Sequence, residues 1–177
     1  MPKIDESIPF QTMNIAVLTV SDTRTEKDDK SGDLLAQMLT DAGHILADKK
    51  IVKDDIPALQ AQVKDWIAND GIDVVITTGG TGFTGRDITP EAVKPLYDKE
   101  IEGFSTVFHM LSYEKVGTST IQSRACGGLT GDTLIFSVPG SPGACKDAWK
   151  GILQYQLDIR HRPCNFVEIM PRFLESE

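Results

Sequence analysis

The sequence predicts a three-layer α/β domain built on a doubly wound, mostly parallel sheet. The first observation is a set of apolar runs rich in branched side chains, at residues 13–20, 72–77 and 133–138, which are typical of strands buried on both faces. The second is that stretches with helical spacing of apolar residues separate these runs, as in doubly wound folds. We expect one domain over residues 13–177, preceded by an N-terminal tail or strap over residues 1–12.

The first part of this domain predicts a strand, a loop, a helix and a second strand. The strand at the start is followed by the polar, charged residues 21–30, which predict a surface loop. A helix comes next, with Ser31 or Asp33 as its candidate N-cap and Gly43 at its end. Residues 45–52 predict the second strand.

The middle of the chain predicts a helix, a strand and a glycine-rich loop. Asp55 precedes a proline in the first turn of an amphipathic stretch, which indicates a helix start. A buried strand at residues 72–77 then leads into the loop at residues 78–87. Thr89 and Pro90 predict the N-cap and first position of the next helix.

The remaining elements are helical stretches around one further strand. Residues 90–116 predict a mostly helical segment that is interrupted near Pro95 and Gly103. After the strand at residues 133–138, residues 144–157 predict a final amphipathic helix.

Composition excludes several classes of protein. The chain has 177 residues with 26 acidic and 18 basic side chains, a net charge of −8, which argues against a general nucleic-acid binder. Cys126, Cys145 and Cys164 form no C-x-x-C pair, so we expect reduced thiols and a cytoplasmic location. The sequence contains no Cys/His cluster of the kind that forms a zinc site. No apolar run approaches the ~20 residues of a membrane span, and no signal-peptide pattern is present, so we expect no membrane partner.

The glycine-rich loop is the strongest local signal for a binding site. Four glycines and four threonines lie within residues 77–85, directly after a buried strand. A plain turn needs only one glycine, whereas several glycines let backbone N–H groups approach a phosphate. Ligands of open α/β sheets bind beyond the carboxyl ends of the strands. The loop therefore predicts a phosphate-binding site.

Two familiar phosphate motifs do not fit this loop. Gly80, Gly82 and Gly85 have the G-x-G-x-x-G spacing, but residues 86–88 separate the loop from its helix. A P-loop requires Lys followed by Ser or Thr after the last glycine, and this chain has Arg86-Asp87 there. We reject both interpretations.

Asp87 has two possible roles at this stage. A carboxylate beside bound phosphate is favourable if Mg²⁺ lies between them. The simpler role is to cap the helix that follows. The spacing leaves both roles open.

Four motifs occur in order along the chain. They are S-D at residues 21–22, V-x-D-D at 52–55, T-T-G-G-T-G-x-x-x-R-D-x-T-P-E at 77–91 and P-G-S-P at 139–142. With these motifs the chain resembles the MoaB/MogA family of molybdenum cofactor biosynthesis. The resemblance extends over residues 12–165. The MoaB branch is indicated by D-K-S-G at 29–32, G-T-S-T at 117–120, Q-S-R at 122–124 and R-P-C-N-F at 162–166.

The resemblance implies transfer of AMP from Mg·ATP to the terminal phosphate of molybdopterin, with release of pyrophosphate. Asp54 and Asp87 match the acids needed for activity in the family, with Asp87 assigned to Mg²⁺ or to the reacting phosphates. Asp55 is the better helix cap of the V-x-D-D pair. The other residues implied to contact molybdopterin or nucleotide are Ser21, Asp22, Gly79, Gly80, Thr81, Gly82, Arg86, Pro139, Gly140 and Ser141.

Some MoaB-branch proteins have lost these motifs, but this sequence retains both acids, which favours an active enzyme. The alternative is a molybdopterin- or nucleotide-binding protein of the same pathway without turnover, acting as a carrier or assembly partner. A third reading, a nucleotide hydrolase similar to competence-damage-inducible proteins, is disfavoured because those usually carry a further domain. The resemblance also implies a homotrimer or homohexamer, Mg²⁺ as the only cofactor, and contacts with other proteins of the pathway.

Overall fold

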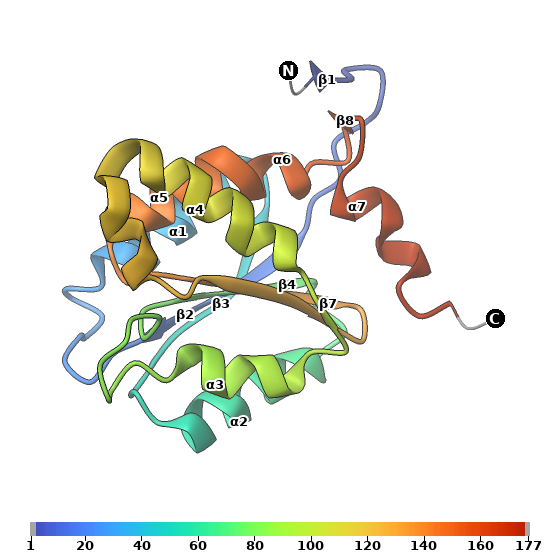
Figure 1. The fold of residues 1–177 in the computed structure, drawn as a ribbon. Helices are drawn as coiled ribbons and strands as arrows, with labels where there is room; N and C mark the ends of the chain where they lie inside the picture. Colours follow the sequence, from blue (N-terminus) through green and yellow to red (C-terminus); the bar gives the residue numbers. More distant parts are fainter. Residues whose placement is uncertain (1–2, 176–177) are drawn as a thin grey trace.

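The computed structural model describes residues 3–175, which form a six-stranded mixed sheet covered by helices on both faces (Figure 1). The strand order is β3-β2-β4-β7-β6-β5. The strands are β2 (Asn14–Val20), β3 (Ile45–Val52), β4 (Val74–Thr78), β5 (Lys99–Glu100), β6 (Cys126–Thr130) and β7 (Thr133–Val138). The first four strands in this order are parallel, and β6 is antiparallel to both of its neighbours. The predicted α/β fold with a mostly parallel sheet is confirmed.

Residues 3–175 contain seven α-helices, together with a π-helical segment and short 3-10 turns. They are α1 (Lys30–Asp41), α2 (Ile56–Ile67), α3 (Thr89–Val93), α4 (Glu102–Val116), α5 (Pro142–Ala148), α6 (Gln154–Gln156) and α7 (Phe166–Ile169). A π-helical segment spans Trp149–Leu153, and 3-10 turns span Lys94–Leu96, Gly117–Gln122 and Met170–Arg172. Among residues 3–175, no helix is both long and apolar enough to cross a membrane.

The alternation of side chains along β2 divides the core into two layers. Ile15 and Val17 pack in one cluster with apolar residues of α1, α4 and α5, whereas Leu18 and Val20 pack in a second cluster with residues of α2 and α3. Both sets are almost fully buried, because every strand of the centre has helices on both sides. Figure 1 shows α2 and α3 on one face of the sheet and α1, α4, α5 and α6 on the other.

The predicted strands lie close to their observed positions, but two strands of the six-stranded sheet, β5 and β6, are absent from the prediction. The predicted strand at residues 45–52 coincides with β3, and that at 133–138 coincides with β7. β6 has the sequence CGGLT and therefore few of the branched residues that mark a strand. Its Gly128 is required by packing, since a Cβ there would lie 2.2 Å from the Tyr97 ring. The hairpin of β6 and β7 places Leu129 opposite Leu134.

One helical prediction is confirmed and another needs correction. The interruption predicted near Pro95 and Gly103 is present: a 3-10 turn at Lys94–Leu96 and β5 separate α3 from α4, and Gly103 lies in the first turn of α4. The final helix begins at Pro142, two residues before the predicted start, and widens into the π-helical segment.

The start of α1 is also different from the prediction. Neither Ser31 nor Asp33 is its N-cap; Asp29 is, and its Oδ1 accepts a hydrogen bond of 3.0 Å from the Gly32 N–H. Asp29 is fully buried, and its Oδ2 accepts a 2.8 Å hydrogen bond from Thr19 Oγ1 and lies 3.3 Å from Lys49 Nζ. This tertiary environment selects Asp29 from several adjacent residues that could each cap a helix.

The N-terminal segment crosses the surface as a strap. β1 (Lys3–Ile4) pairs antiparallel with β8 (His161–Arg162). The Phe10 ring makes two contacts: its centroid lies 5.1 Å from that of the His44 ring, and the Arg160 guanidinium lies 5.0 Å from it. Residues 1–2 of the predicted tail, and residues 176–177 of the predicted domain, lie outside the described residues.

We expect Asp29→Ala to lower the free energy of unfolding by about 2–4 kcal/mol, because it removes a helix cap and leaves the buried Thr19 hydroxyl without its acceptor. Asp33→Ala is the matched control, since Asp33 is exposed and contacts the same Lys49. The control should change stability by less than about 0.5 kcal/mol. Urea denaturation of the two variants measures this, and equal effects would contradict a special role for Asp29.

Candidate functional site

The carboxyl ends of the parallel strands bring the sequence-predicted site residues to one edge of the sheet. Ser21 and Asp22 follow β2, Asp54 follows β3, the glycine-rich loop follows β4, and residues 139–141 follow β7. The Ser21 N–H donates to the Val52 carbonyl at 2.9 Å, and the Asp54 N–H donates to Asp22 Oδ1 at 3.3 Å. This edge lies to the left of the sheet in Figure 1, where the loop between β4 and α3 is drawn in green.

Gly79 sits where three of these strand ends meet. Its N–H donates to the Val138 carbonyl at 3.0 Å, its φ is +104°, and a Cβ on it would lie 2.3 Å from the Val20 carbonyl oxygen. A Cβ on Gly140 would in turn lie 3.1 Å from the Gly79 Cα. Only glycine satisfies both the left-handed backbone and the close approach.

Thr89 holds the loop rather than capping a helix. Its Oγ1 donates to the Gly79 carbonyl at 2.8 Å, and its N–H donates to the Gly80 carbonyl at 2.9 Å. The predicted N-cap role is therefore wrong: Ile88 occupies that position, without a side-chain hydrogen bond. A Cβ on Gly80, whose φ is +64°, would lie 2.4 Å from Thr89 Oγ1.

Arg86 and Asp22 form a two-bond ion pair across the site. Arg86 Nε and Nη2 donate to the two carboxylate oxygens of Asp22, each at 2.8 Å. The hydrogen bonds from Arg86 hold the pKa of Asp22 below its usual value, and the pair raises the pKa of Arg86. Arg86, which the resemblance implies as a ligand contact, therefore lies at the site in a pair with one of its acids.

Asp54 is the least compensated acid of the site. Its Oδ1 would lie 3.2 Å from a Cβ on Gly80, so its carboxylate faces the loop. Burial, followed by repulsion from Asp22, raises the pKa of Asp54, and Asp87 adds to the repulsion. A hydrogen bond from the Asp22 backbone N–H and the nearby Arg86 guanidinium offset only part of this rise in the pKa. Asp55 is the N-cap of α2, as predicted, and accepts from the Ala58 N–H at 2.9 Å.

Asp87 closes a turn within the loop. Its Oδ2 accepts from the Thr84 N–H at 2.8 Å and from the Thr84 hydroxyl at 2.6 Å. Burial pushes its pKa upward, but these bonds and one from the Gly82 N–H outweigh that effect, so the pKa of Asp87 lies below its usual value. The helix-capping alternative for Asp87 is therefore wrong, because its hydrogen bonds go to the loop and not to α3.

Arg124 is a site residue that the sequence analysis did not select. Its N–H donates to the Thr81 carbonyl at 2.8 Å, its Nε to the Gly82 carbonyl at 2.7 Å and its Nη2 to the Asp87 carbonyl at 2.9 Å. It also pairs with Glu91 and lies 5.2 Å from the Phe83 ring. Arg124 thus stabilises the glycine-rich loop by binding its backbone carbonyl groups. In the sequence the Q-S-R segment marks only the MoaB branch. The role of Arg124 depends on its position just before β6, a strand that the sequence does not predict.

The turn after β7 completes the edge. Ser141 is the N-cap of α5 and accepts from the Ala144 N–H at 3.2 Å. The Gly140 carbonyl accepts from Arg24 Nη2 at 2.6 Å and from Ser31 Oγ at 3.1 Å. Pro139 contributes its carbonyl oxygen, which accepts from Thr78 Oγ1 at 3.0 Å. These bonds tie the turn to the first loop of the chain.

The acids of this edge do not form a closed metal-binding cluster. Within the described part of the chain, no group of three or more His, Cys, Asp or Glu side chains could hold a metal ion. The edge instead combines glycine backbone with carboxylates at two different strand ends. That combination suits a cation shared with phosphate oxygens, since Mg²⁺ binds one or two carboxylates and completes its shell with phosphate and water.

We expect Gly79→Ala to destabilise the fold by about 3 kcal/mol or more, because the added methyl group meets a backbone oxygen at a positive φ. Gly85→Ala is the matched control, since a Cβ on Gly85 meets nothing within 4 Å. The control should change the free energy of unfolding by less than about 0.5 kcal/mol. Urea denaturation of both variants checks this, and a tolerated Gly79→Ala would disprove the close approach.

Asp54→Asn should stabilise the ligand-free protein at neutral pH. The raised pKa of Asp54 means that its charged form is less favourable in the folded state than in the unfolded state. The gain should be full above the folded-state pKa and should disappear as the pH falls below the ordinary carboxyl range, where the wild-type side chain is protonated. We therefore expect a higher melting temperature for Asp54→Asn than for the wild type at pH 7. Scanning calorimetry from pH 7 down to pH 4 tests this, and a gain that does not shrink with pH would contradict it.

Comparisons with known proteins identify the family of this chain. The family described as "Probable molybdopterin binding domain" matches residues 16–159. Molybdenum cofactor biosynthesis protein B of Escherichia coli (strain K12) is 54% identical over 160 residues, which cover 90% of this chain and 94% of that protein. The protein of the same name from Staphylococcus carnosus (strain TM300) is 51% identical over 146 residues, which cover 81% of this chain and 85% of that protein.

Solved structures show the same relationship. A crystal structure of molybdenum cofactor biosynthesis protein B has a TM-score of 0.83 and 41% identity, covering 92% of this chain and 96% of that one. The structure of the tungsten cofactor synthesizing protein MoaB from Pyrococcus furiosus has a TM-score of 0.69 and 42% identity, and the match covers 81% of this chain and 91% of that one. With a glycine-rich loop and acids at the carboxyl edge of the sheet, the chain belongs to the MoaB family of molybdopterin-binding domains.

Proposed function

We propose that this protein transfers AMP from Mg·ATP to the terminal phosphate of molybdopterin and releases pyrophosphate. Family membership supports the coarser statement that it acts in molybdenum cofactor biosynthesis. The observation that carries the finer proposal is Asp54, a poorly compensated carboxylate that faces a glycine loop at the end of the sheet. Carboxylates whose pKa is raised by burial and by neighbouring acids are typical of functional sites.

The loop supplies the positive end of the site. Among residues 3–175 the N–H groups of Gly80 and Thr81 donate to no other residue, so they are available to phosphate oxygens. Thr89 and Arg124 fix the loop carbonyls on the outside, which keeps these N–H groups in place before a ligand binds. Preorganised donors of this kind lower the barrier by stabilising charge that develops on the phosphate.

Asp87 and Asp54 are the residues that would hold Mg²⁺, because the Asp54 carboxylate lies next to Gly80 and the Asp87 carboxylate next to Gly82 of the loop. The ion supplies charge neutralisation of the triphosphate when bound. Asp22 is already engaged by Arg86, so it is better placed to orient Arg86 than to bind metal. Ser21 and the turn at Pro139, Gly140 and Ser141 form the neighbouring walls on which molybdopterin and ATP would rest.

The proposed assembly is a homotrimer or homohexamer, as the resemblance implies. Exposed apolar side chains on α4 support self-association: Val107, Met110, Tyr113 and Val116 are all more than 40% exposed. Exposed apolar patches of this kind are typical of interaction surfaces.

The test is incubation of the protein with molybdopterin, ATP and Mg²⁺, followed by detection of adenylylated molybdopterin and pyrophosphate. Asp87→Asn and Asp54→Asn should each lower the rate by about 100-fold or more, since each removes charge that positions the reacting phosphates. Asp65→Asn on the exposed face of α2 is the matched control and should leave the rate unchanged. Bound molybdopterin without product would instead favour the non-catalytic binding protein.

A further inference from the structure

Arg24 joins the first loop of the chain to the turn after β7, and the function proposed above gives it no role. Its Nη2 donates to the Gly140 carbonyl at 2.6 Å, and its Nη1 lies 3.9 Å from Asp29 Oδ1. Arg86 and Arg124 make different contacts, since Arg86 binds an acid of the site and Arg124 binds carbonyls of the glycine-rich loop. The hydrogen bond of Arg24 is therefore made to the turn.

The segment that carries Arg24 also contacts the glycine-rich loop. Asp22 accepts two hydrogen bonds of 2.8 Å from Arg86, which lies at the end of that loop. The Ser21 hydroxyl accepts from the backbone N–H of Arg24 at 3.2 Å, which closes a local turn of the chain between the two contacts. Residues 21–24 thus bind the loop through one side chain and the turn after β7 through another.

A buried carboxylate limits the directions that the Arg24 side chain can take. Asp29 is fully buried and accepts hydrogen bonds from Thr19 Oγ1 at 2.8 Å and from the Gly32 N–H at 3.0 Å, and Lys49 Nζ lies 3.3 Å from its Oδ2. The Arg24 side chain is 29% exposed, so its guanidinium lies between this carboxylate and solvent. Opposite charges attract more strongly where water is partly excluded.

Gly140, which Arg24 binds, is also the residue at which the turn approaches the glycine-rich loop. A Cβ on Gly140 would lie 3.1 Å from the Gly79 Cα. The Gly140 carbonyl accepts from Arg24 and, at 3.1 Å, from the hydroxyl of Ser31, a fully buried residue in the first turn of α1. Both lone pairs of this oxygen are thereby used. A shift of the turn away from the loop would break both bonds.

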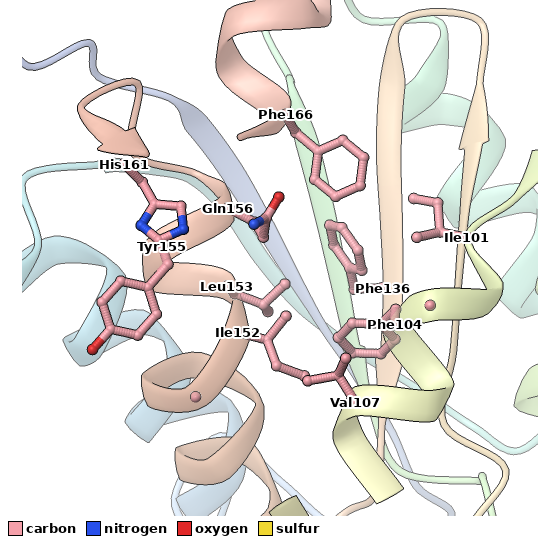
Figure 2. Close-up of a pocket in the computed structure, with 12 residues that line it drawn as sticks. Ile101, Phe104, Val107, Phe136, Ile152, Leu153, Tyr155, Gln156, His161 and Phe166 are labelled. Carbon is pink, nitrogen blue, oxygen red and sulfur yellow. The ribbon is translucent and has the colours of Figure 1, made fainter. Parts of the chain in front are cut away.

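The strand before the turn is held in a different way, by core packing. Figure 2 shows Phe136 of β7 between Phe104 of α4 and Phe166 of α7, and its ring centroid lies 4.9 Å and 6.1 Å from theirs. β7 ends at Val138, and the chain leaves the sheet there. Apolar contacts thus fix the strand, whereas polar contacts such as that of Arg24 fix the turn.

We propose that Arg24 is a positioning residue, which holds the turn at residues 139–141 at a fixed distance from the glycine-rich loop, so that both walls contact one molecule of ATP. The loop N–H groups bind the phosphates, and the turn contacts the same nucleotide from the end of β7. Ser31 adds to this role through the second hydrogen bond to the Gly140 carbonyl. The role rests on the function proposed above, in which the turn is one wall of the substrate site.

The first measurement is a titration of the full ¹⁵N-labelled chain with ATP and Mg²⁺, without molybdopterin. In the wild type we expect saturable shifts of the Gly80 and Thr81 amides in the loop and of the Gly140 and Ser141 amides in the turn. Arg24→Ala should keep the loop shifts, with a Kd changed by less than about threefold, because the lost hydrogen bond belongs to the turn. The same variant should lose most of the turn shifts.

Three further variants sharpen the titration. Arg24→Lys keeps a charged donor and should restore part of the turn shifts, though not all, because an ammonium lacks the fork geometry of a guanidinium. Ser31→Ala removes the second bond to the same carbonyl, so it should weaken the turn shifts in the same direction, and it tests the role even if Arg24→Ala does not fold. Arg172→Ala is the control, since Arg172 is exposed and pairs with Glu175, and it should behave as the wild type.

Adenylyl transfer gives the second readout. Arg24→Ala should lower kcat by about 100-fold at saturating substrates, as expected for misplacement by about 1 Å, with a melting temperature close to that of the wild type. Turn amides that do not respond in the wild type, turn shifts that persist in Arg24→Ala, or loss of loop and turn shifts together would overturn the role of Arg24. A wild type that binds ATP on both walls but forms no product would contradict the proposed function alone, and the titration would still decide the role of Arg24.

Discussion

The contact that organises this protein is the close approach of backbone at Gly79. Its Cα lies against Gly140, its N–H bonds to Val138, and the space where a side chain would stand is occupied by the carbonyl of Val20. The ends of three parallel strands are thereby held together at one point. Everything at the edge of the sheet, including the loop, the two acids and the turn after β7, is positioned relative to this contact.

The close approach at Gly79 also brings several charged side chains together around the loop. Arg86 neutralises Asp22, and Thr84 satisfies Asp87, but burial and the neighbouring carboxylates leave Asp54 unfavourable as an anion. The edge is therefore short of positive charge until a cation or a cationic group arrives. Arg124 does not relieve it, since its guanidinium is occupied by loop carbonyls and Glu91. The charged Asp54 side chain lowers stability at this edge, where the preorganised N–H groups of the loop are available to a phosphate ligand.

Most of the fold could be predicted from the sequence, and the exceptions share a cause. β2, β3, β4 and β7 are continuous or alternating runs whose burial leaves a local pattern. β6 contains two adjacent glycines because the Tyr97 ring and Phe136 lie against them, so its strand character comes from pairing with β7 and not from its own residues. Missing β6 also hid Arg124, which directly precedes that strand.

The sequence by itself determined the layers, the positions of four strands along the chain and the position of the glycine-rich loop, because periodic burial and turn composition are properties of neighbouring residues. Only the tertiary structure decided what each acid does. Asp22 and Arg86 are 64 positions apart, and Asp22 and Asp54 are 32 apart, so no local pattern shows which acid is neutralised and which is left facing the loop. The same holds for Asp29 as the cap of α1 and for Thr89 as a brace of Gly79: each hydroxyl or carboxylate could serve a nearby helix, and a partner brought by the fold determines its bond.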